Sequence, residues 1–194
     1  MLLDFGCGTG AFLSEVEKTG RKVMGIEPDS GARALASGRI RGSILPPDKL
    51  HTLPTASFAV ITLWHVLEHV GDPVEHCKAF YRLLQDDGVL VLALPNPESR
   101  DADYYKSYWA AWDVPRHLNH FKQADISTLG GMAGFRRMEV RPMPLDAFYI
   151  SWLSEKYKGS GMLSPFLGFI QGFRSNLMAS GKGTSSLLYI LRKQ

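Results

Sequence analysis

The chain has 194 residues, of which 45% are hydrophobic, and its 22 Lys and Arg residues against 19 Asp and Glu give a formal net charge of +3. A chain of this length is expected to form one domain and to bury about 70% of the surface that it exposes when unfolded. The small positive charge gives no argument for a nucleic-acid partner. Two cysteines exclude a disulfide framework and a zinc-binding spacing.

Targeting and membrane-spanning segments are not evident. The amino terminus lacks a basic leader region, and the longest apolar run, residues 58–64, is far below the roughly 18 residues needed to cross a bilayer. Together with the scarcity of cysteine, this favours a cytoplasmic protein.

The first element in chain order is an apolar strand that runs into a glycine-rich turn. Leu2 and Leu3 begin the strand, Asp4 interrupts it, and glycine then alternates at positions 6, 8 and 10. Glycine allows positive φ and lets a ligand approach the backbone closely. A helix predicted over residues 11–19 directs its unpaired N–H groups into the same space. The pattern predicts a nucleotide-binding strand–turn–helix.

A second strand, predicted over residues 22–26, ends in an acid. This residue, Glu27, follows Gly10 by seventeen positions. In a βαβ unit the end of the second strand lies beside the glycine turn, and a carboxylate there accepts from both ribose hydroxyls, at roughly 1.5–3 kcal/mol for each charge-assisted bond. The turn and the acid together predict an adenosine site.

Two classes of adenosine cofactor fit this pattern, a dinucleotide and a cofactor that carries a sulfonium. Residues 6–11 satisfy G-x-G-x-x-A, so a nicotinamide or flavin dinucleotide stays possible on the glycines alone. Asp4, two positions before the first glycine, would repel a pyrophosphate but suits a cofactor that carries a sulfonium and an α-ammonium group. The sequence therefore favours the sulfonium cofactor over a dinucleotide.

The rest of the chain alternates between strands and helices. Helices are predicted over residues 30–37, from the Asp72 cap onward and after Phe121, and residues 145–181 are helical in character but interrupted by glycine and proline. This alternation predicts an α/β fold with a doubly wound, mostly parallel sheet. Its further strands are predicted at residues 40–45, 58–64, 89–94, 136–140 and 185–191.

From Leu2 to Val140 the chain resembles the class I S-adenosylmethionine-dependent methyltransferases, especially those akin to ubiquinone-biosynthesis O-methyltransferases. The resemblance is carried by DFGCGTG at residues 4–10, FAVITLWHVLEH at residues 58–69 and DVPRHLNHF at residues 113–121. It implies a Rossmann-like fold of seven strands, with an antiparallel last strand and residues 145–181 as a helical insertion before it. Such proteins usually have a helix before the first strand, so either this chain is truncated or other segments cover that face.

The resemblance implies methyl transfer from S-adenosylmethionine to a small-molecule or lipid-like acceptor. An NAD(P)-dependent oxidoreductase and a non-catalytic S-adenosylmethionine-binding module are the alternatives. Asp4 and the turn are expected to hold the methionine end, and Glu27 the ribose. Near the adenine a clear acid is lacking, so Ser43 and the backbone of Ile44 are expected there in its place. The predicted cofactor-binding residues are Asp4, Gly6, Cys7, Gly8, Gly10, Glu27, Pro28, Ile44, Trp64 and His65.

Candidate catalytic residues are histidines. His117 and His120 are expected to bind the acceptor or to remove its proton, which for a hydroxyl acceptor contributes about 10²–10⁴-fold. His65, Glu68 and His69 match the inverted zinc-protease pattern H-x-x-E-H, but they follow a strand instead of lying within a helix. We therefore predict no metal, and expect Glu68 and His69 to fix the loop.

Two later stretches suggest the acceptor pocket and the molecular surface. The aromatic residues at 104–109, with Trp112, predict a lid or an acceptor pocket. The apolar stretch 162–170 is expected to pack on its own domain or on a second subunit, or to contact a membrane surface peripherally. Its flanking cations are Lys156, Lys158, Arg174 and Lys182.

Overall fold

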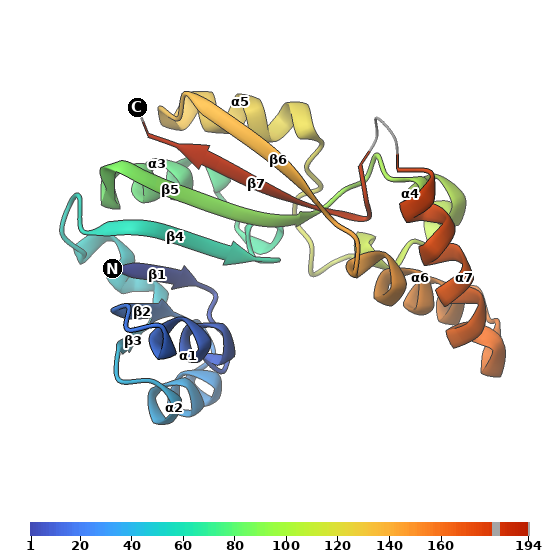
Figure 1. The fold of residues 1–194 in the computed structure, drawn as a ribbon, viewed down its shortest axis with the longest axis horizontal. Coiled ribbons are helices and arrows are strands. Elements are labelled where there is room, and N and C mark those ends of the chain that lie inside the picture. The colour runs from blue at the N-terminus through green and yellow to red at the C-terminus, as the bar shows by residue number, and fades with distance from the viewer. Residues whose placement is uncertain (180–182, 194) are drawn as a thin grey trace.

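The computed structural model describes residues 1–179 and 183–193, without the side chain of Arg137, and contains a seven-stranded sheet with helices on both faces (Figure 1). The strand order is β3-β2-β1-β4-β5-β7-β6, and β7 is antiparallel to both of its neighbours while the other pairs are parallel. The predicted doubly wound, mostly parallel sheet with an antiparallel last strand is therefore confirmed. The strands are β1 Leu2–Phe5, β2 Val23–Ile26, β3 Ser43–Leu45, β4 Phe58–Trp64, β5 Leu84–Pro95, β6 Arg137–Met143 and β7 Ser186–Arg192.

The helices follow the strands in the expected alternation. Asp72 caps α3, since its carboxylate accepts from the Glu75 amide at 3.0 Å, and Pro73 occupies the first turn. The α-helices are α1 Ala11–Lys18, α2 Ser30–Arg39, α3 Pro73–Leu83, α4 Arg100–Tyr105, α5 Gln123–Ala133, α6 Asp146–Tyr157 and α7 Ser164–Leu177. Short 3-10 turns are η1 Pro47–Thr52, η2 Leu67–His69, η3 Lys106–Tyr108, η4 Ala110–Trp112 and η5 Gly161–Leu163.

Strand β5 begins earlier than the sequence indicates. The predicted helix end at residues 86–88 and strand start at Val89 are both displaced, because α3 ends at Leu83 and β5 starts at Leu84. Leu84 is fully buried and pairs with Phe58, after which a register shift restores the regular ladder. The burial of Leu84 thus favours strand structure from residue 84 onward, although the turn-forming residues 86–88 follow it.

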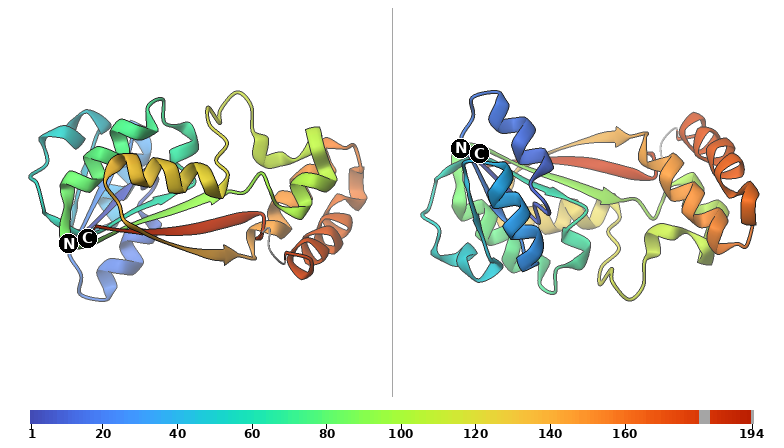
Figure 2. Two further views of the ribbon diagram at one scale, coloured as in Figure 1. Left: turned by 90° about the horizontal axis from the view of Figure 1, so that it is seen from above. Right: turned by 90° about the horizontal axis from the view of Figure 1, so that it is seen from below.

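The two faces of the sheet are covered unequally (Figure 2). Helices α3 and α5 cover one face, where Ile61, Leu90 and their neighbours form the main core. Helices α1 and α2 lie on the opposite face beside β1 to β3. On the same face farther along the sheet, Val91 of β5 and Ile190 of β7 pair with each other and are only partly buried. Figure 2 shows no helix of the described residues over β5 and β7 on this face. Within those residues, the expectation that other segments cover this face is not met.

Helices α6 and α7, with η5 between them, connect β6 to β7 and extend with α4 beyond the carboxyl ends of the parallel strands (Figure 1). Tyr105 and Trp109 are almost fully buried there against Ile150. These two aromatic residues therefore form a small core and do not form the expected lid. Residues 180 and 181 of the predicted insertion, and Lys182, lie outside the described residues. No described helix has the length and apolarity to cross a membrane.

Candidate functional site

The glycine turn after β1 and the acid after β2 lie in contact. The Gly8 amide donates to Glu27 Oε2 at 2.8 Å, and the Asp29 amide donates to Glu27 Oε1 at 2.9 Å. Gly8 has a φ of +52°, and a Cβ built there would meet nothing within 4 Å. Each carboxylate oxygen keeps a further lone pair for another donor. The turn and the acid thus share the place that an adenosine site requires.

Three further turn amides, those of Gly6, Cys7 and Gly10, already have acceptors within the protein. The amides of Gly6 and Cys7 donate to the Ile26 carbonyl at 2.7 and 3.1 Å, and the Gly10 amide donates to the Cys7 carbonyl at 2.9 Å. Cys7 is buried in a small cluster with Leu13, and burial raises the pKa of its thiol to about 12. A ligand at the turn would therefore meet glycine Cα surfaces and the first amides of α1, which lack intrahelical acceptors.

Asp4 lies almost fully buried in β1. Thr62 of the adjacent strand β4 donates its hydroxyl to Asp4 Oδ1 at 2.6 Å. Burial raises the pKa of Asp4 to about 7, although the Thr62 hydrogen bond lowers it, and the nearby charge of Glu27 raises it further. Asp4 therefore changes charge near neutral pH unless a cation approaches it.

The raised pKa of Asp4 makes the stability of the ligand-free protein depend on pH. An unfolded Asp4 ionises near its ordinary pKa of 3.8, whereas the folded group ionises near 7, so the folded state is progressively destabilised as the pH rises between these values. We expect Asp4→Asn to raise the thermal midpoint at a pH of about 8 and to leave it near the wild-type value at a pH below 3.8, where Asp4 is protonated in both states. An equal midpoint shift at both pH values in differential scanning calorimetry would contradict this assignment.

Trp64 ends β4 on the side of the glycine turn. Its ring packs edge-to-face on Phe12 of α1, with 5.1 Å between centroids. The indole Nε1 is buried and has no hydrogen-bond acceptor within the described part of the chain. An unpaired buried donor destabilises a protein by about 1–3 kcal/mol, so this N–H is suited to a bound group that accepts from it.

Pro28 and Ile44 lie at the outer edge of the same region. The carbonyl oxygen of exposed Pro28 accepts from the Arg33 guanidinium at 2.6 Å. The side chain of Ile44 packs against the small cluster around Cys7. A contact between a ligand and the backbone of Ile44 stays a prediction.

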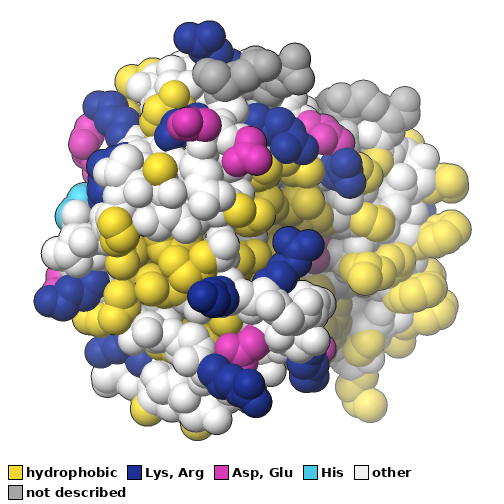
Figure 3. All heavy atoms as spheres, turned by 60° about the vertical axis from the view of Figure 1, so that its left-hand side comes forward, with side chains coloured by type: hydrophobic (Ala, Val, Ile, Leu, Met, Phe, Trp, Pro, Cys, Tyr) yellow, Lys and Arg dark blue, Asp and Glu magenta, His cyan; other side chains and the backbone are white. Residues whose placement is uncertain are grey.

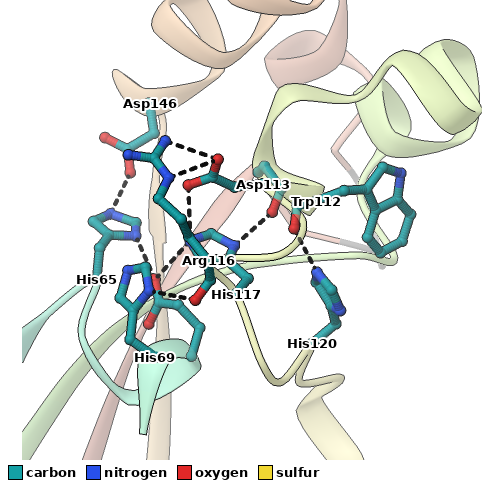
Figure 4. Close-up of polar contacts among 10 residues, drawn as sticks. His65, His69, Trp112, Asp113, Arg116, His117, His120 and Asp146 are labelled. Atoms are coloured by element: carbon teal, nitrogen blue, oxygen red, sulfur yellow. Dashed lines mark hydrogen bonds and ion pairs between the residues drawn. The ribbon is translucent and has the colours of Figure 1, made fainter.

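His65 follows Trp64, and its ring is directed toward Asp146 at the start of α6 (Figure 4). Its backbone adopts a left-handed φ of +54°. Its Nε2 lies 3.0 Å from Asp146 Oδ2 of α6, and its Nδ1 lies 3.5 Å from Glu68 Oε1. Burial alone lowers the pKa of His65, but Asp146 and Glu68 raise it to about 9. A protonated His65 therefore links the end of β4 to the start of α6.

This link predicts a measurable effect of Asp146. Because the folded-state pKa of His65 lies above its ordinary value of 6.5, the link stabilises the fold fully below 6.5 and is lost as the pH rises through about 9. We expect Asp146→Asn to move the His65 pKa from about 9 toward 6.5, followed by NMR titration of the imidazole. Asp48→Asn, which removes an exposed carboxylate paired with Lys49, is the control. An unchanged His65 titration in Asp146→Asn would refute the link.

A cavity of about 320 Å³ lies between the ends of β4 and β5 and helix α6. One wall is polar and the other is apolar, so a ligand with a polar end and an apolar body would match it. The polar wall consists of His65, Glu68, Asp113, Arg116, His117 and Asp146. The apolar wall consists of Pro95, Ala110, Ala111, Tyr149, Ile150, Leu153 and Tyr157.

His117 presents one ring nitrogen to the carboxylates of the polar wall (Figure 4). Its Nδ1 lies 2.9 Å from the Ala111 carbonyl, and because a carbonyl only accepts, Nδ1 carries the proton. Its Nε2 lies 3.9 Å from Glu68 Oε1 and 3.8 Å from Asp113 Oδ2. Burial lowers the pKa of His117. At neutral pH the ring is therefore neutral and its Nε2 is free to accept a proton.

His120 is placed differently from His117. Its Nε2 hydrogen-bonds the Trp112 carbonyl at 2.8 Å, and its exposed ring packs against the Trp112 ring. It contributes to a second cavity of only about 10 Å³ and is not part of the larger one. The structure thus separates the two candidate histidines.

Glu68 is nearly inaccessible to solvent. Neither carboxylate oxygen has a hydrogen-bond donor within the described part of the chain, although two histidines lie within 3.9 Å. The segment Leu67–His69 is a single 3-10 turn, not the helix of an inverted zinc protease. Ligand-type atoms of Glu68, His69 and His117 lie within 4.8 Å of one another. The absence of a metal stays a prediction, which elemental analysis of the purified protein can check.

Two contacts fell outside the predicted set. Thr62 is a lone polar residue in the apolar run 58–64, and this signal could have identified it as a buried partner. Asp146 meets His65 across 81 positions of the chain, and no local pattern marks it. The acceptor-side wall from α6 therefore came from the structure alone.

Comparison with known proteins completes the description of the site. The profile of a family described as a methyltransferase domain matches residues 1–140. The ubiquinone biosynthesis O-methyltransferase of Psychrobacter arcticus is 31% identical over 183 residues, which cover 84% of this chain and 70% of that protein. The enzyme of the same name from Ruegeria pomeroyi is 31% identical over 101 residues, so that the match spans only 41% of its length and 49% of this chain.

Solved structures share the fold at lower sequence identity. A methyltransferase from Thermotoga maritima, described as a possible histamine N-methyltransferase, has a TM-score of 0.69 at 19% identity, covering 100% of this chain and 81% of that one. Phosphoethanolamine N-methyltransferase 2 from Haemonchus contortus, solved with S-adenosylmethionine, has a TM-score of 0.67 at 16% identity, covering 99% and 48%. These likenesses extend over α6, α7 and β7, which the family profile does not reach.

Proposed function

The chain belongs to the class I S-adenosylmethionine-dependent methyltransferases, and from this premise we propose that it methylates a hydroxyl-bearing small molecule with an apolar body. One observation carries the proposal. Trp64 and His65 are consecutive residues at the end of β4, and Trp64 faces the glycine turn whereas His65 faces the two-walled cavity. A cofactor site and an acceptor site therefore meet at one strand end, where ligands of open α/β sheets bind.

We infer that S-adenosylmethionine binds at the glycine turn. When bound, it supplies an electrophilic methyl group on a sulfonium. Glu27 accepts from the ribose hydroxyls, Asp4 offers a negative charge to the α-ammonium group, and the Trp64 indole N–H gains an acceptor. The open surface over Gly8 and the unpaired Trp64 N–H are the features that fit this cofactor. The proposed cofactor-binding residues are Asp4, Gly6, Cys7, Gly8, Gly10, Glu27, Pro28, Ile44 and Trp64. His65, also predicted to bind the cofactor, is assigned instead to the acceptor cavity that it lines.

The acceptor lies in the two-walled cavity with its hydroxyl toward the histidines. Tyr149, Ile150 and Leu153 of α6 contact its apolar body, which makes a lipid-like or aromatic acceptor suitable. The relatives named ubiquinone biosynthesis O-methyltransferases support a hydroxyl as the methylated group. Because the sheet and α6 both line the cavity, we infer that residues 1–194 act as one methyltransferase domain.

His117 serves as the general base in this proposal. Its Nε2 takes the proton of the acceptor hydroxyl, while Nδ1 stays fixed on the Ala111 carbonyl. The imidazolium that results is stabilised by the carboxylates of Glu68 and Asp113. Alignment of the acceptor in the cavity can supply about 7–11 kcal/mol of the barrier reduction, and the base adds about 10²–10⁴-fold.

Calorimetric titration followed by methyl labelling tests the proposal. The purified protein is expected to bind S-adenosylhomocysteine and not NADH, and to transfer a deuterated methyl group from the cofactor to a molecule in a cell extract. Binding of NADH without S-adenosylhomocysteine would overturn the proposal in favour of an oxidoreductase. Binding of S-adenosylhomocysteine without any labelled product would identify a non-catalytic binding module.

A further inference from the structure

Helix α7 buries its small and polar face and exposes its apolar face, which is the reverse of an ordinary surface helix. The residues that it buries are small or polar, and the residues that it exposes are large and apolar. The buried residues are Ser164, Gly168, Gln171, Gly172 and Ser175. The exposed residues are Phe166, Leu167, Phe169, Ile170, Phe173 and Leu177.

Close packing against α6 explains the buried face. A Cβ built on Gly168 would lie 2.5 Å from Trp152 Cα, and one built on Gly172 would lie 2.9 Å from the Ala147 carbonyl oxygen. The two backbones can approach this closely only because the contact residues are small, which is the packing that helices use inside membranes. Most of the large side chains of α7 therefore point outward, and the ring of Phe169, although mostly exposed, also stacks on Phe148 of α6 with 5.2 Å between centroids.

The outward face is strongly apolar. Phe166, Phe169 and Phe173 are 65%, 60% and 56% exposed, and Leu177 is 75% exposed. Met162, one turn before the helix, is 99% exposed. Figure 3 shows hydrophobic side chains gathered at the end of the molecule that carries α6 and α7, at the right of the view. A contiguous patch of this kind marks a contact surface.

Positive charge borders this face. By helical spacing Arg174 lies between Ile170 and Leu177, and it lines a groove of about 240 Å³ with Arg100 of α4. Asp103 also lines the groove. Arg100 uses Nε to donate to the Met178 carbonyl at 3.4 Å, and its guanidinium has further N–H donors beside this one. No Asp or Glu follows Glu155 in the sequence, so the whole carboxyl-terminal segment adds only positive charge.

We propose that α7 lies on the surface of a bilayer that contains anionic phospholipids. Its phenylalanines enter the boundary between headgroups and acyl chains, and Arg100 and Arg174 face lipid phosphates. A second copy of the chain fits less well, because a two-fold contact through this face would bring the arginines of both copies toward each other. The lipid contact is independent of the methyl-transfer activity proposed above.

Sedimentation with vesicles tests this inference on the full chain. Wild-type protein is expected to bind phosphatidylcholine vesicles that contain phosphatidylglycerol, and to bind pure phosphatidylcholine at least tenfold more weakly. Phe166→Ser, Phe169→Ser and Phe173→Ser combined are expected to lower the partition coefficient at least tenfold. Arg100→Glu with Arg174→Glu should abolish the preference for the anionic lipid.

Matched controls separate this result from general loss of structure. Leu35→Ser with Met132→Ser removes side chains that are 63% and 61% exposed on α2 and α5, and should leave vesicle binding unchanged. Circular dichroism checks that every variant is folded. Wild-type protein that fails to bind anionic vesicles would overturn the proposal, and so would a dimer in light scattering that the triple Phe variant dissociates without any change in vesicle binding.

Discussion

Replacing Glu27 by alanine is expected to weaken S-adenosylhomocysteine binding by about 100-fold or more. In the proposed complex Glu27 would accept from both ribose hydroxyls, and two charge-assisted hydrogen bonds together contribute about 3 kcal/mol or more, with about 1.4 kcal/mol for each factor of ten. The same oxygens accept from the Gly8 and Asp29 amides, so the variant also loosens the turn. Isothermal titration calorimetry measures the affinity, and a thermal scan measures the stability.

Two further variants make this result specific. Glu27→Gln keeps the shape but has one acceptor oxygen for two facing amides, so its affinity should fall between those of wild type and alanine. Glu15→Gln removes an exposed acid on α1 that pairs with Lys18, away from the glycine turn's contacts with Glu27, and should leave the affinity unchanged. If folded Glu27→Ala bound S-adenosylhomocysteine with wild-type affinity, Glu27 would not bind the ribose.

Replacing His117 by alanine is expected to lower kcat by about 10²–10⁴-fold without a change in cofactor affinity. The wild-type rate should fall only below the ordinary histidine pKa of 6.5, because burial lowers the pKa of His117, and this acidic limb should vanish in the variant. Rates are measured with the acceptor found by methyl labelling, and calorimetry with S-adenosylhomocysteine measures the affinity.

His120→Ala is the matched control for this prediction. Its ring is held by the Trp112 carbonyl outside the larger cavity, so the loss in kcat should stay below about tenfold. If His120→Ala were the variant that lost the acidic limb, the base would have to be reassigned. If neither variant lost it, acceptor alignment alone would account for the rate.

The elements with strong local patterns were predictable from the sequence. Strand β4 spans the predicted residues 58–64, because a continuous apolar run between polar segments has few alternatives. The turn and Glu27 meet as predicted, since the spacing of a βαβ unit fixes their relation. The start of β5 was placed too late, because turn-forming Asp and Gly residues at 86–88 concealed the burial of Leu84.

The acceptor side could not be predicted in the same way. The link between His65 and Asp146 joins residues far apart in the chain, and neither residue type marks its partner. Periodicity assigns residues of α7 to common faces but does not say which face is inward. That orientation depends on the close approach to α6 at Gly168 and Gly172, which is a property of the packed pair.

The reversed orientation of α7 also reverses the usual rules of mutational tolerance. A larger residue at Gly168 or Gly172 would force the axes of α6 and α7 apart. These two glycines are therefore the positions of α7 that tolerate substitution least. The bulky positions on the other side are more than half exposed at Phe166, Phe169 and Phe173, so serine or threonine there costs less, although Phe169 would lose its stacking on Phe148 of α6. A library that randomises the phenylalanines should return well-folded, less adhesive proteins, whereas one that fills the small positions should return unfolded ones.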